Sequence, residues 1–374
     1  MDINRYRLPG FEKRFSRDPR NKALLIVIEA QRKPKNFIED SSAEMRELIA
    51  SANIKLMGEI QGKLPDPSAK YFIREGKLAE IHGAAKRLGV NVIIFNVDLT
   101  PGQASNIEAF CKVSTMDRTG LILEIFGKRA KSKEGKLQVE LAQLNYALPR
   151  MGGLGEVMSR LGGGVGTRGP GEQELQRDKR KVRSRIHQVK KDLEDVKKHR
   201  ELLREGRKRK NFKTVALVGY TNAGKSTLLN ALTGANSFVQ DQMFATLDPV
   251  TRLEKIAGGN QVLFIDTVGF LRDLPHTLVE AFHATLEETI EADVLIHVLD
   301  VSSVKVKEMK DAVDKVLAEL KAAEKPTILA LNKADLLTDI EQKYVQTEWP
   351  MGVLISAKNK LGMNSLLAKL GDLL

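Results

Sequence analysis

Apolar and polar positions alternate in blocks over the first part of the chain. Residues 23–28 and 90–97 are largely apolar runs, which are typical of strands buried on both faces. Residues 43–52 and 75–88 instead carry apolar side chains at the spacing of helices that cover such a sheet. Because strands and helices alternate, we expect residues 1–128 to form a small parallel α/β domain. The spacing of its polar side chains indicates no catalytic or metal site.

Two stripes of apolar residues follow, at the spacing of helices that pack against other helices. The first has intervals of 4, 3, 4 and 3 residues and consists of Leu137, Leu141, Leu144, Leu148 and Met151. The second has intervals of 7, 4, 3, 4, 3 and 7 residues and consists of Leu175, Val182, Ile186, Val189, Leu193, Val196 and Leu203. Because residues 172–205 contain no proline or glycine, they predict one helix about 50 Å long.

Between the stripes lies a glycine-rich stretch, residues 152–171, with the sequence GGLGEVMSRLGGGVGTRGPG. This composition predicts a loop rather than a helix, and it includes Arg160 and Arg168. Residues 129–212 are therefore predicted to form an antiparallel helical hairpin with this loop at its tip. Residues 164–169 also match G-x-G-x-x-G, but no buried strand precedes them, which argues against a dinucleotide-binding turn.

A nucleotide-binding pattern begins at residue 213. The apolar run 214–218 predicts a buried strand, and residues 219–226 continue as GYTNAGKS before a helical pattern. This is the phosphate-binding loop G-x-x-x-x-G-K-S in the strand, loop and helix setting that it requires. In such a loop, backbone N–H groups surround the β-phosphate and the lysine, here Lys225, neutralises β- and γ-phosphate oxygens. Ser226 is predicted to bind Mg²⁺ through its hydroxyl.

A second predicted strand, residues 262–265, ends in Asp266-Thr-Val-Gly269. Asp266 is placed to hold Mg²⁺ through water, and the Gly269 amide is placed to contact a γ-phosphate, so this loop can sense that phosphate. Between the two motifs, residues 244–249 read FATLDP. Thr246 is the candidate there for a second hydroxyl on Mg²⁺ that is released after hydrolysis. The alternative for Thr246 is an ordinary turn residue.

The motif that selects the base follows a third predicted strand, residues 327–331, and reads Asn332-Lys-Ala-Asp335. The Asp335 carboxylate can accept both guanine N1–H and N2–H, which adenine does not offer. The stem of Lys333 is expected to lie over the base. Residues 356–358, with the sequence SAK, are similar to the last guanine-contacting loop, where a backbone N–H meets O6. The four motifs in this order predict GTP rather than ATP.

One position departs from the Ras-like pattern. Ras-like GTPases place a water-orienting glutamine directly after the glycine of the second motif, whereas this chain has Phe270, whose ring cannot hydrogen-bond the attacking water. We therefore expect slow intrinsic hydrolysis and completion of the site by another group. A potassium ion is one candidate, because Asn222 stands where potassium-activated relatives place their cation-binding asparagine. The alternative is that Asn222 only shapes the loop.

Charge adds a candidate partner to this picture. The 374 residues carry a formal net charge of +12, and residues 172–213 alone contain 17 lysines and arginines against 8 acidic residues. A basic helix behind a glycine-rich tip favours contact with RNA, the alternative being a flexible linker beside a solvated helix. The single cysteine, Cys111, and the lack of an apolar run of about 20 residues indicate a cytoplasmic protein without a transmembrane segment.

The motifs GYTNAGKS, FATLDP, DTVGF, NKAD and SAK, in this order behind the α/β domain, resemble the HflX family of translational GTPases. The glycine-rich stretch followed by Glu172-x-x-Leu175-x-x-Asp178-x-Arg180 is more specific to that family than the shared nucleotide motifs. The resemblance covers nearly the whole chain. It implies an N-terminal α/β domain (1–128), the hairpin (129–212) and a P-loop GTPase domain with a doubly wound sheet (213–374).

The resemblance also implies which residues contact the nucleotide. The phosphate loop would comprise Gly219, Tyr220, Thr221, Asn222, Ala223, Gly224, Lys225, Ser226 and Thr227. The first switch would comprise Phe244, Ala245, Thr246, Leu247 and Asp248, and the second Asp266, Thr267, Val268 and Gly269. Guanine would be held by Asn332, Lys333, Ala334, Asp335, Ser356, Ala357 and Lys358. Mg²⁺ would lie on Ser226, Thr246 and Asp266, and Lys225, Thr246 and Gly269 would serve hydrolysis.

The partners that the resemblance implies are GTP and GDP together with the large ribosomal subunit and its rRNA, but not DNA. The hairpin tip would reach toward the peptidyl-transferase region, and the activity would be GTP-dependent splitting or rescue of stalled ribosomes, often under stress, by a cytoplasmic monomer. Some members continue beyond the helix predicted at 363–373, and the functions of that extension are not transferred. An ATP-linked activity assigned to the N-terminal domain of some members stays open, because no second phosphate loop is visible. The alternative function is a GTP-regulated protein that binds a protein partner through its hairpin.

Overall fold

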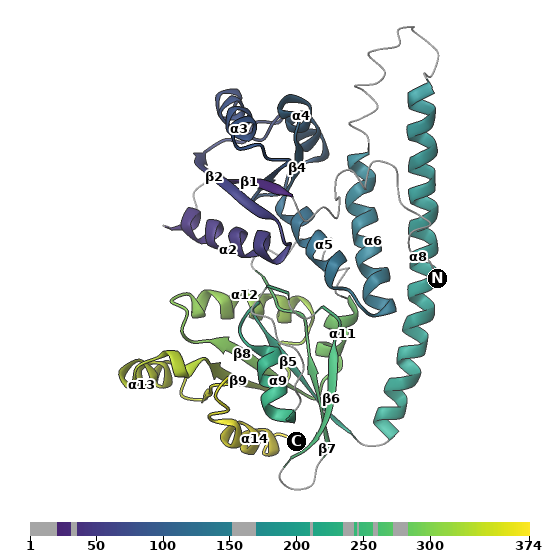
Figure 1. The fold of residues 1–374 in the computed structure, drawn as a ribbon. Coiled ribbons are helices and arrows are strands. Elements are labelled where there is room, and N and C mark those ends of the chain that lie inside the picture. Colours follow the sequence, from purple (N-terminus) through teal and green to yellow (C-terminus); the bar gives the residue numbers. More distant parts are fainter. Residues whose placement is uncertain are drawn as a thin grey trace. The chain divides into compact units, whose positions relative to one another are not determined.

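The computed structural model describes residues 21–30, 36–151, 170–209, 212–234, 243–244, 247–256, 261–271 and 283–374 (Figure 1). The chain divides into two compact units. The N-terminal unit comprises Met1–Lys128 and Val139–Asp192, and the C-terminal unit comprises Arg129–Gln138 and Leu193–Leu374. Within the described residues, each unit contains one sheet. Among the described residues, no helix is long and apolar enough to cross a membrane.

The N-terminal unit is built on a parallel sheet with the strand order β2-β1-β3-β4. Its strands are β1 (Lys22–Ala30), β2 (Lys55–Leu64), β3 (Val92–Phe95) and β4 (Ser114–Met116). Its helices are α2 (Phe37–Ser51), α3 (Glu75–Leu88), α4 (Pro101–Cys111) and α5 (Arg118–Arg129). The two predicted apolar runs form the central strands β1 and β3, which are buried on both faces. The predicted parallel α/β architecture is confirmed.

Two further helices, α6 (Lys133–Arg150) and α8 (Pro170–Arg209), run antiparallel to each other in Figure 1. Within the N-terminal unit they are joined by Arg185, whose Nε and Nη2 lie 2.6 and 2.8 Å from the two carboxylate oxygens of Glu140. Val182 and Val189 of the predicted stripe are fully buried, as an interhelical stripe requires. The predicted hairpin is confirmed. The predicted tip loop, residues 152–171, lies outside the described residues up to residue 169, including Arg160 and Arg168. Its last two residues, Pro170 and Gly171, were wrongly assigned to the loop, because they begin α8.

The helix α6 is buried more widely than its sequence stripe predicts. Leu137 and Leu144 are buried, but so are Val139 and Tyr146, which lie off the stripe. Tyr146 packs against Gly120 of α5, where a Cβ would lie 2.7 Å from the Tyr146 hydroxyl. Because α6 contacts neighbours on more than one side, one stripe did not identify its full buried surface.

The C-terminal unit is a doubly wound sheet with the strand order β10-β9-β8-β5-β7-β6, in which only β6 is antiparallel to its neighbour. Its strands are β5 (Lys213–Gly219), β6 (Val250–Lys255), β7 (Gln261–Asp266), β8 (Val294–Asp300), β9 (Thr327–Asn332) and β10 (Val353–Leu354). Its helices are α9 (Lys225–Thr233), α11 (His283–Glu291), α12 (Val306–Glu319), α13 (Asp339–Glu348) and α14 (Met363–Gly371), with a 3₁₀ turn at Ala334–Leu336. The predicted P-loop domain is confirmed, and its motifs follow the carboxyl ends of β5, β7 and β9.

Candidate nucleotide site

The phosphate loop joins β5 to α9 through two glycines that the geometry requires. Gly219 has φ 152°, and a Cβ there would overlap the carbonyl oxygen of Val298. Gly224 has φ 95°, a left-handed conformation that disfavours other residues, and a Cβ there would overlap Asn332 Nδ2. Gly224 is also the N-cap of α9, and none of the described side chains caps that helix. The first N–H groups of α9 therefore point to where an anion can bind.

Lys225 and Ser226 open α9 at the end of this loop. Lys225 is buried, and its Nζ donates to the carbonyl oxygens of Gly219 and Tyr220 at 3.0 and 2.9 Å. Burial lowers the pKa of Lys225 to about 8, while the nearby Asp266 carboxylate opposes that shift. Ser226 Oγ donates to Asp266 Oδ2 at 2.6 Å. The structure thus brings two of the three predicted Mg²⁺ ligands together, and their hydroxyl and carboxylate oxygens suit that ion.

The second motif, residues 266–269, packs directly on the phosphate loop. Thr267 Oγ1 donates to the carbonyl oxygen of Leu217 at 2.7 Å, which fixes the turn after β7. At Gly269 a Cβ would lie 2.8 Å from Thr221 Cα and 3.0 Å from Lys225 Nζ, so only glycine allows this approach. Thr221 Oγ1 is buried without a hydrogen-bond partner among the described residues. A polar atom in that state at the loop suits a bound polar ligand.

Phe270 and Asn222, the two positions tied to hydrolysis in the sequence, have different environments. The Phe270 side chain is buried, and its backbone N–H and C=O pair with Gly219 O and Thr221 N at 3.1 and 2.9 Å. Phe270 therefore connects the second motif to the phosphate loop. Asn222 is exposed and has φ 62°, a left-handed conformation that asparagine tolerates.

The base motif is organised around Asn332. Its Nδ2 donates to the carbonyl oxygen of Ala223 at 2.8 Å, and its Oδ1 accepts from the Ala357 N–H at 3.0 Å. Asn332 therefore ties the phosphate loop to the loop after β10. Lys333 has φ 65° and its Nζ lies 2.7 Å from Asp300 Oδ2, while the Asp335 side chain is exposed.

The last loop is fixed by residues close to it in space. The Ala334 N–H donates to the carbonyl oxygen of Ile355 at 3.1 Å. Ser356 is completely buried and its Oγ accepts from the Asn359 N–H at 3.1 Å, whereas Lys358 is exposed. Residues 332–335 and 356–358 thus form one edge of the sheet, as their predicted common role requires.

The predicted first switch is described in part. Ala245 and Thr246 lie outside the described residues, whereas Phe244 and Leu247 are buried. The Asp248 carboxylate accepts from the backbone N–H groups of Lys131 and Ser132 at 2.7 and 2.8 Å and from the Ser132 hydroxyl. Asp248 was predicted to be a nucleotide contact, and no local pattern could have revealed partners that are more than a hundred residues away.

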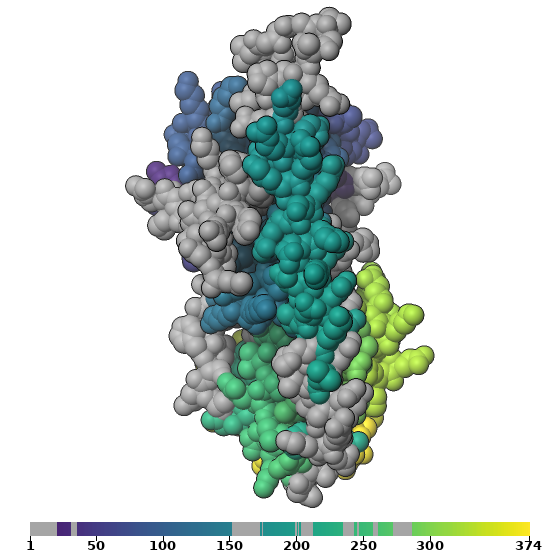
Figure 2. All heavy atoms as spheres, turned by 90° about the vertical axis from the view of Figure 1, so that its right-hand side faces the viewer, coloured from purple at the N-terminus to yellow at the C-terminus, as the bar shows by residue number. Residues whose placement is uncertain are grey.

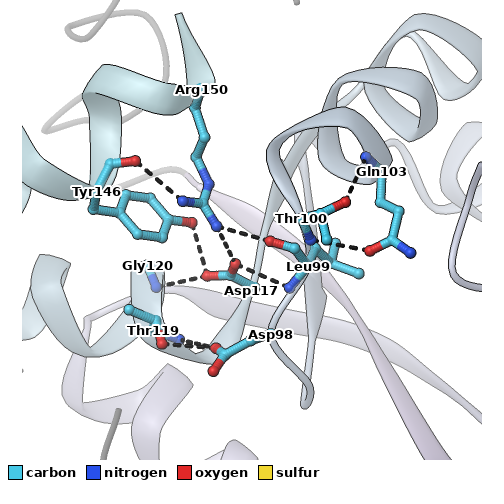
Figure 3. Close-up of polar contacts among 9 residues, drawn as sticks. All are labelled: Asp98, Leu99, Thr100, Gln103, Asp117, Thr119, Gly120, Tyr146 and Arg150. Carbon is cyan, nitrogen blue, oxygen red and sulfur yellow. Dashed lines mark hydrogen bonds and ion pairs between the residues drawn. The ribbon is translucent and has the colours of Figure 1, made fainter. Parts of the chain in front are cut away.

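The N-terminal unit has its own polar cluster, centred on Asp117 directly after β4 (Figure 3). Asp117 Oδ1 accepts from the Gly120 N–H and the Tyr146 hydroxyl at 2.8 and 2.7 Å. Its Oδ2 accepts from the Leu99 N–H and Arg150 Nη2 at 3.2 and 2.8 Å. Burial raises the pKa of Asp117, and the Arg150 guanidinium opposes that shift. This cluster was not predicted, because its members are spread over three segments of the sequence.

Comparison with known proteins agrees with this site. Three family models match successive parts of the chain: GTP-binding GTPase N-terminal (residues 39–127), GTP-binding GTPase Middle Region (129–207) and 50S ribosome-binding GTPase (214–333). GTPase HflX of Caldanaerobacter subterraneus is 47% identical over 93% of this chain and 80% of its own length. GTPase HflX of Escherichia coli is 45% identical over 88% of this chain and 78% of its own length.

A solved structure with similar architecture is a complex of SsGBP with GDP. It is 28% identical, with a TM-score of 0.51 over 94% of this chain and 98% of that one. The relatives therefore match across both units and not only across the nucleotide motifs. At 40% identity or more over most of its length, the chain is a GTPase and belongs to the HflX family.

Proposed function

We propose that this GTPase binds the large ribosomal subunit through its rRNA and uses GTP to split or rescue stalled ribosomes. The observation that carries the proposal is the exposed basic surface of α8, a helix that faces the viewer in Figure 2. Its exposed basic side chains are Arg177, Arg180, Lys181, Arg183, Lys190, Lys191, Lys197 and Lys198. Such a row of cations on one continuous helix suits a phosphate backbone. The name of the matching family model, 50S ribosome-binding GTPase, supports the same partner.

The proposed nucleotide contacts follow the geometry of the site. Lys225 and the first N–H groups of α9 bind the phosphates, and Asp335 accepts the N–H groups of guanine. Ser226 and Asp266 hold Mg²⁺ together with Thr246. The ion would neutralise negative charge on the β- and γ-phosphates. Gly269 offers its amide to the γ-phosphate, close to Lys225 Nζ.

We propose that GTP orders Thr246 and Gly269, that the ordered state favours the ribosome, and that hydrolysis allows release. Because Phe270 is buried and pairs only through its backbone with the phosphate loop, its side chain does not orient water. The ribosome is then expected to complete or order the catalytic site. A potassium ion on Asn222, which is exposed at the phosphate loop, is the second candidate for that role.

The test is GTP turnover in potassium buffer with and without large ribosomal subunits, together with co-sedimentation over a salt series. Strong stimulation and a steep loss of binding with rising salt would support the proposal. Repeating the turnover assay in sodium buffer tests the potassium candidate. No stimulation and no co-sedimentation would contradict ribosome binding and favour a protein partner held by the hairpin.

Charge variants separate rRNA contact from general electrostatics. The double change Lys190→Gln and Lys191→Gln removes two exposed charges from α8, and Lys86→Gln with Arg87→Gln removes two exposed charges from α3. We expect the α8 pair to reduce the slope of log affinity against log salt by about one to two, and the α3 pair to leave it unchanged. Equal effects of the two pairs would contradict a specific role of α8.

A further inference from the structure

One carboxylate joins the predicted first switch to the start of α6, entirely within the C-terminal unit. Asp248 Oδ2 accepts from two consecutive backbone N–H groups, those of Lys131 and Ser132, and Oδ1 accepts from the Ser132 hydroxyl. Ser132 Oγ also accepts from the Gly135 N–H at 2.9 Å, in the manner of an N-cap. Three donors on one carboxylate fix both its position and its orientation.

The fit around this carboxylate is close. A Cβ on Gly135 would overlap Asp248 Oδ1 and would lie 3.1 Å from Ser132 Oγ. Gly135 is the third residue of α6 and lies in its first turn, and glycine has a lower helix propensity than alanine. The glycine therefore weakens the helix locally and, at the same place, leaves room for the carboxylate.

Asp248 is also close in sequence to the groups expected at the nucleotide. It follows Thr246 by two residues, with the buried Leu247 between them. Two residues further on, Val250 opens β6 and pairs with Asp266, whose carboxylate accepts from Ser226. The strand pairing fixes the chain from Val250 onward, and the Asp248 contacts fix the chain two residues after Thr246.

A second set of contacts links the first turn of α6 to α11, the described helix that follows residues 266–269 in the chain. Arg200 of α8 places Nη1 2.8 Å from Glu134 Oε1 and pairs through Nη2 with Glu287 of α11. The Arg200 and Glu287 side chains are only 15% and 12% exposed, so this pair is better shielded from solvent than an ordinary surface ion pair. The start of α6 is thus linked to Asp248 directly and to α11 through Arg200.

We propose that Asp248 is a positioning residue for the first switch and that residues 131–135 form its anchor. Fixing the downstream end of the switch lowers the entropy that must be lost when Thr246 is ordered by GTP. The first six residues of α6 belong to the C-terminal unit and its remainder to the N-terminal unit. Because coupling is reciprocal, a force on the hairpin that displaces residues 131–135 weakens GTP binding, and GTP strengthens the anchor.

The test compares the affinities of a non-hydrolysable GTP analogue and of GDP in four variants of the full chain. Asp248→Ala removes the acceptor, and Gly135→Ala displaces it from the α6 side while raising helix propensity. Each is expected to lower the affinity for the analogue about fivefold or more and to change the affinity for GDP less than twofold. Asp248→Asn keeps one oxygen for the two backbone N–H groups and should restore part of the loss. Gly83→Ala in α3, where a Cβ meets nothing within 4 Å, is the matched control and should change neither affinity.

Amide hydrogen exchange directly measures how stable the hydrogen bonds from residues 131 and 132 to Asp248 are. In the unmodified chain, the Lys131 and Ser132 amides should exchange more slowly with the GTP analogue than with GDP, and Gly135→Ala should remove that difference. An unchanged ratio of the two affinities in both Asp248→Ala and Gly135→Ala would overturn the proposal, as would equal exchange with the two nucleotides.

The inference rests on the proposed assignment of residues 244–248 as the first switch, and one further variant separates the two. Asp335→Asn tests the nucleotide site without touching the anchor. If GTP affinity is unchanged in Asp335→Asn, the proposed nucleotide site is wrong. If Asp335→Asn weakens GTP while the two anchor variants keep the normal ratio, the site stands and the anchoring role of Asp248 is wrong.

Discussion

The two sheets of this protein have the same kind of edge, the carboxyl ends of parallel strands, but they use it differently. In open α/β sheets, this edge is where ligands commonly bind. In the N-terminal unit, Asp117 follows β4 and is fully engaged by the chain's own Arg150 and Tyr146. In the C-terminal unit the edge is made of glycine backbone, Lys225 and the hydrogen-bonded oxygens of Ser226 and Asp266.

The helices that begin at these edges differ in the same way. In the N-terminal unit, Thr100 caps α4, accepting from the Gln103 N–H while the Gln103 side chain accepts from the Thr100 N–H. In the C-terminal unit, α9 begins after Gly224, which has no side chain to offer. Topology alone therefore does not define a site: the helix start that is capped by its own side chains is structural, and the helix start without a side-chain cap can bind an anion.

The largest expected effect comes from breaking the Asp117–Arg150 ion pair at the edge of the N-terminal sheet. Arg150→Met leaves the Asp117 carboxylate buried without its cation, and breaking a buried pair in this way costs about 3–5 kcal/mol. Cys111, the single cysteine, is buried on α4, so the rate at which a thiol reagent labels it reports opening of the N-terminal unit. We expect much faster labelling and unchanged nucleotide affinity.

A double variant sharpens this prediction. Adding Asp117→Asn to Arg150→Met removes the uncompensated charge. The double variant should therefore lose less stability than Arg150→Met alone. If Cys111 is labelled as fast in the double variant as in Arg150→Met, the Asp117–Arg150 ion pair does not stabilise the N-terminal unit.

The next largest effect is on nucleotide affinity, at the edge of the C-terminal sheet. Asp335→Asn replaces an acceptor of guanine N1–H and N2–H with a group that also donates, and we expect GTP affinity to fall about a hundredfold, or roughly 3 kcal/mol. Xanthosine nucleotides, which offer an acceptor at that position, should bind better than in the unmodified chain. The measurement is a titration with both nucleotides, and because Asp335 is exposed, the thermal midpoint without nucleotide should not move.

A further effect is the pH dependence of the stability of the C-terminal unit, which contains a buried histidine. His297 in β8 is buried, and burial lowers its pKa to about 4, while Asp314 opposes that shift and Lys310 and Lys225 add to it. The folded state therefore binds fewer protons than the unfolded state between about pH 6.5 and 4. Stability of the C-terminal unit falls as pH falls through this window, by up to about 1.4 kcal/mol per pH unit.

Trp349, the single tryptophan, lies in the C-terminal unit and makes this measurable by fluorescence-detected unfolding. His297→Gln should flatten the dependence between pH 6.5 and 4, because glutamine does not titrate there. Curves of equal slope for the variant and the unmodified chain would show that the acid sensitivity comes from carboxylates elsewhere.

The smallest effect tests the capped helix. Thr100→Ala removes the side-chain acceptor for the Gln103 N–H, and the loss of such a cap costs about 1 kcal/mol. Labelling of Cys111, at the other end of α4, should accelerate by about fivefold, with no change in nucleotide binding. Thr100→Ser, which keeps the hydroxyl, should behave nearly as the unmodified chain does.

The two edges also differ in how far they could be predicted from sequence. The phosphate loop and the base motif were predicted because each is contiguous and directly follows an apolar strand such as β5 or β9. The Asp117 cluster was not, because Asp117 and Arg150 are 33 residues apart and neither belongs to a recognisable pattern. The Asp248 contacts were missed for the same reason over a longer separation.

The strand β2 shows a different limit. It pairs with β1 alone, at the edge of its sheet, and most of its residues are only half-buried. Gly58 and Gly62 interrupt its apolar pattern, and a Cβ on them would lie 2.8 Å from Leu88 Cδ1 and 3.3 Å from Lys77 Cε. An edge strand with a weak apolar pattern gives little signal, whereas β1 and β3, with runs of consecutive buried residues, were predicted.

The contact between the start of α6 and Asp248 forms late during synthesis of the chain, because its two partners are far apart in sequence. Residues 131 and 132 leave the ribosome 117 and 116 residues ahead of Asp248, the side chain that fixes them. At about 5–20 residues per second, the first turn of α6 waits roughly 6–23 s for that partner. The N-terminal sheet is complete well before then, since β4 ends at Met116. A nascent chain therefore carries a folded first sheet and an incomplete helix start until synthesis has passed residue 248.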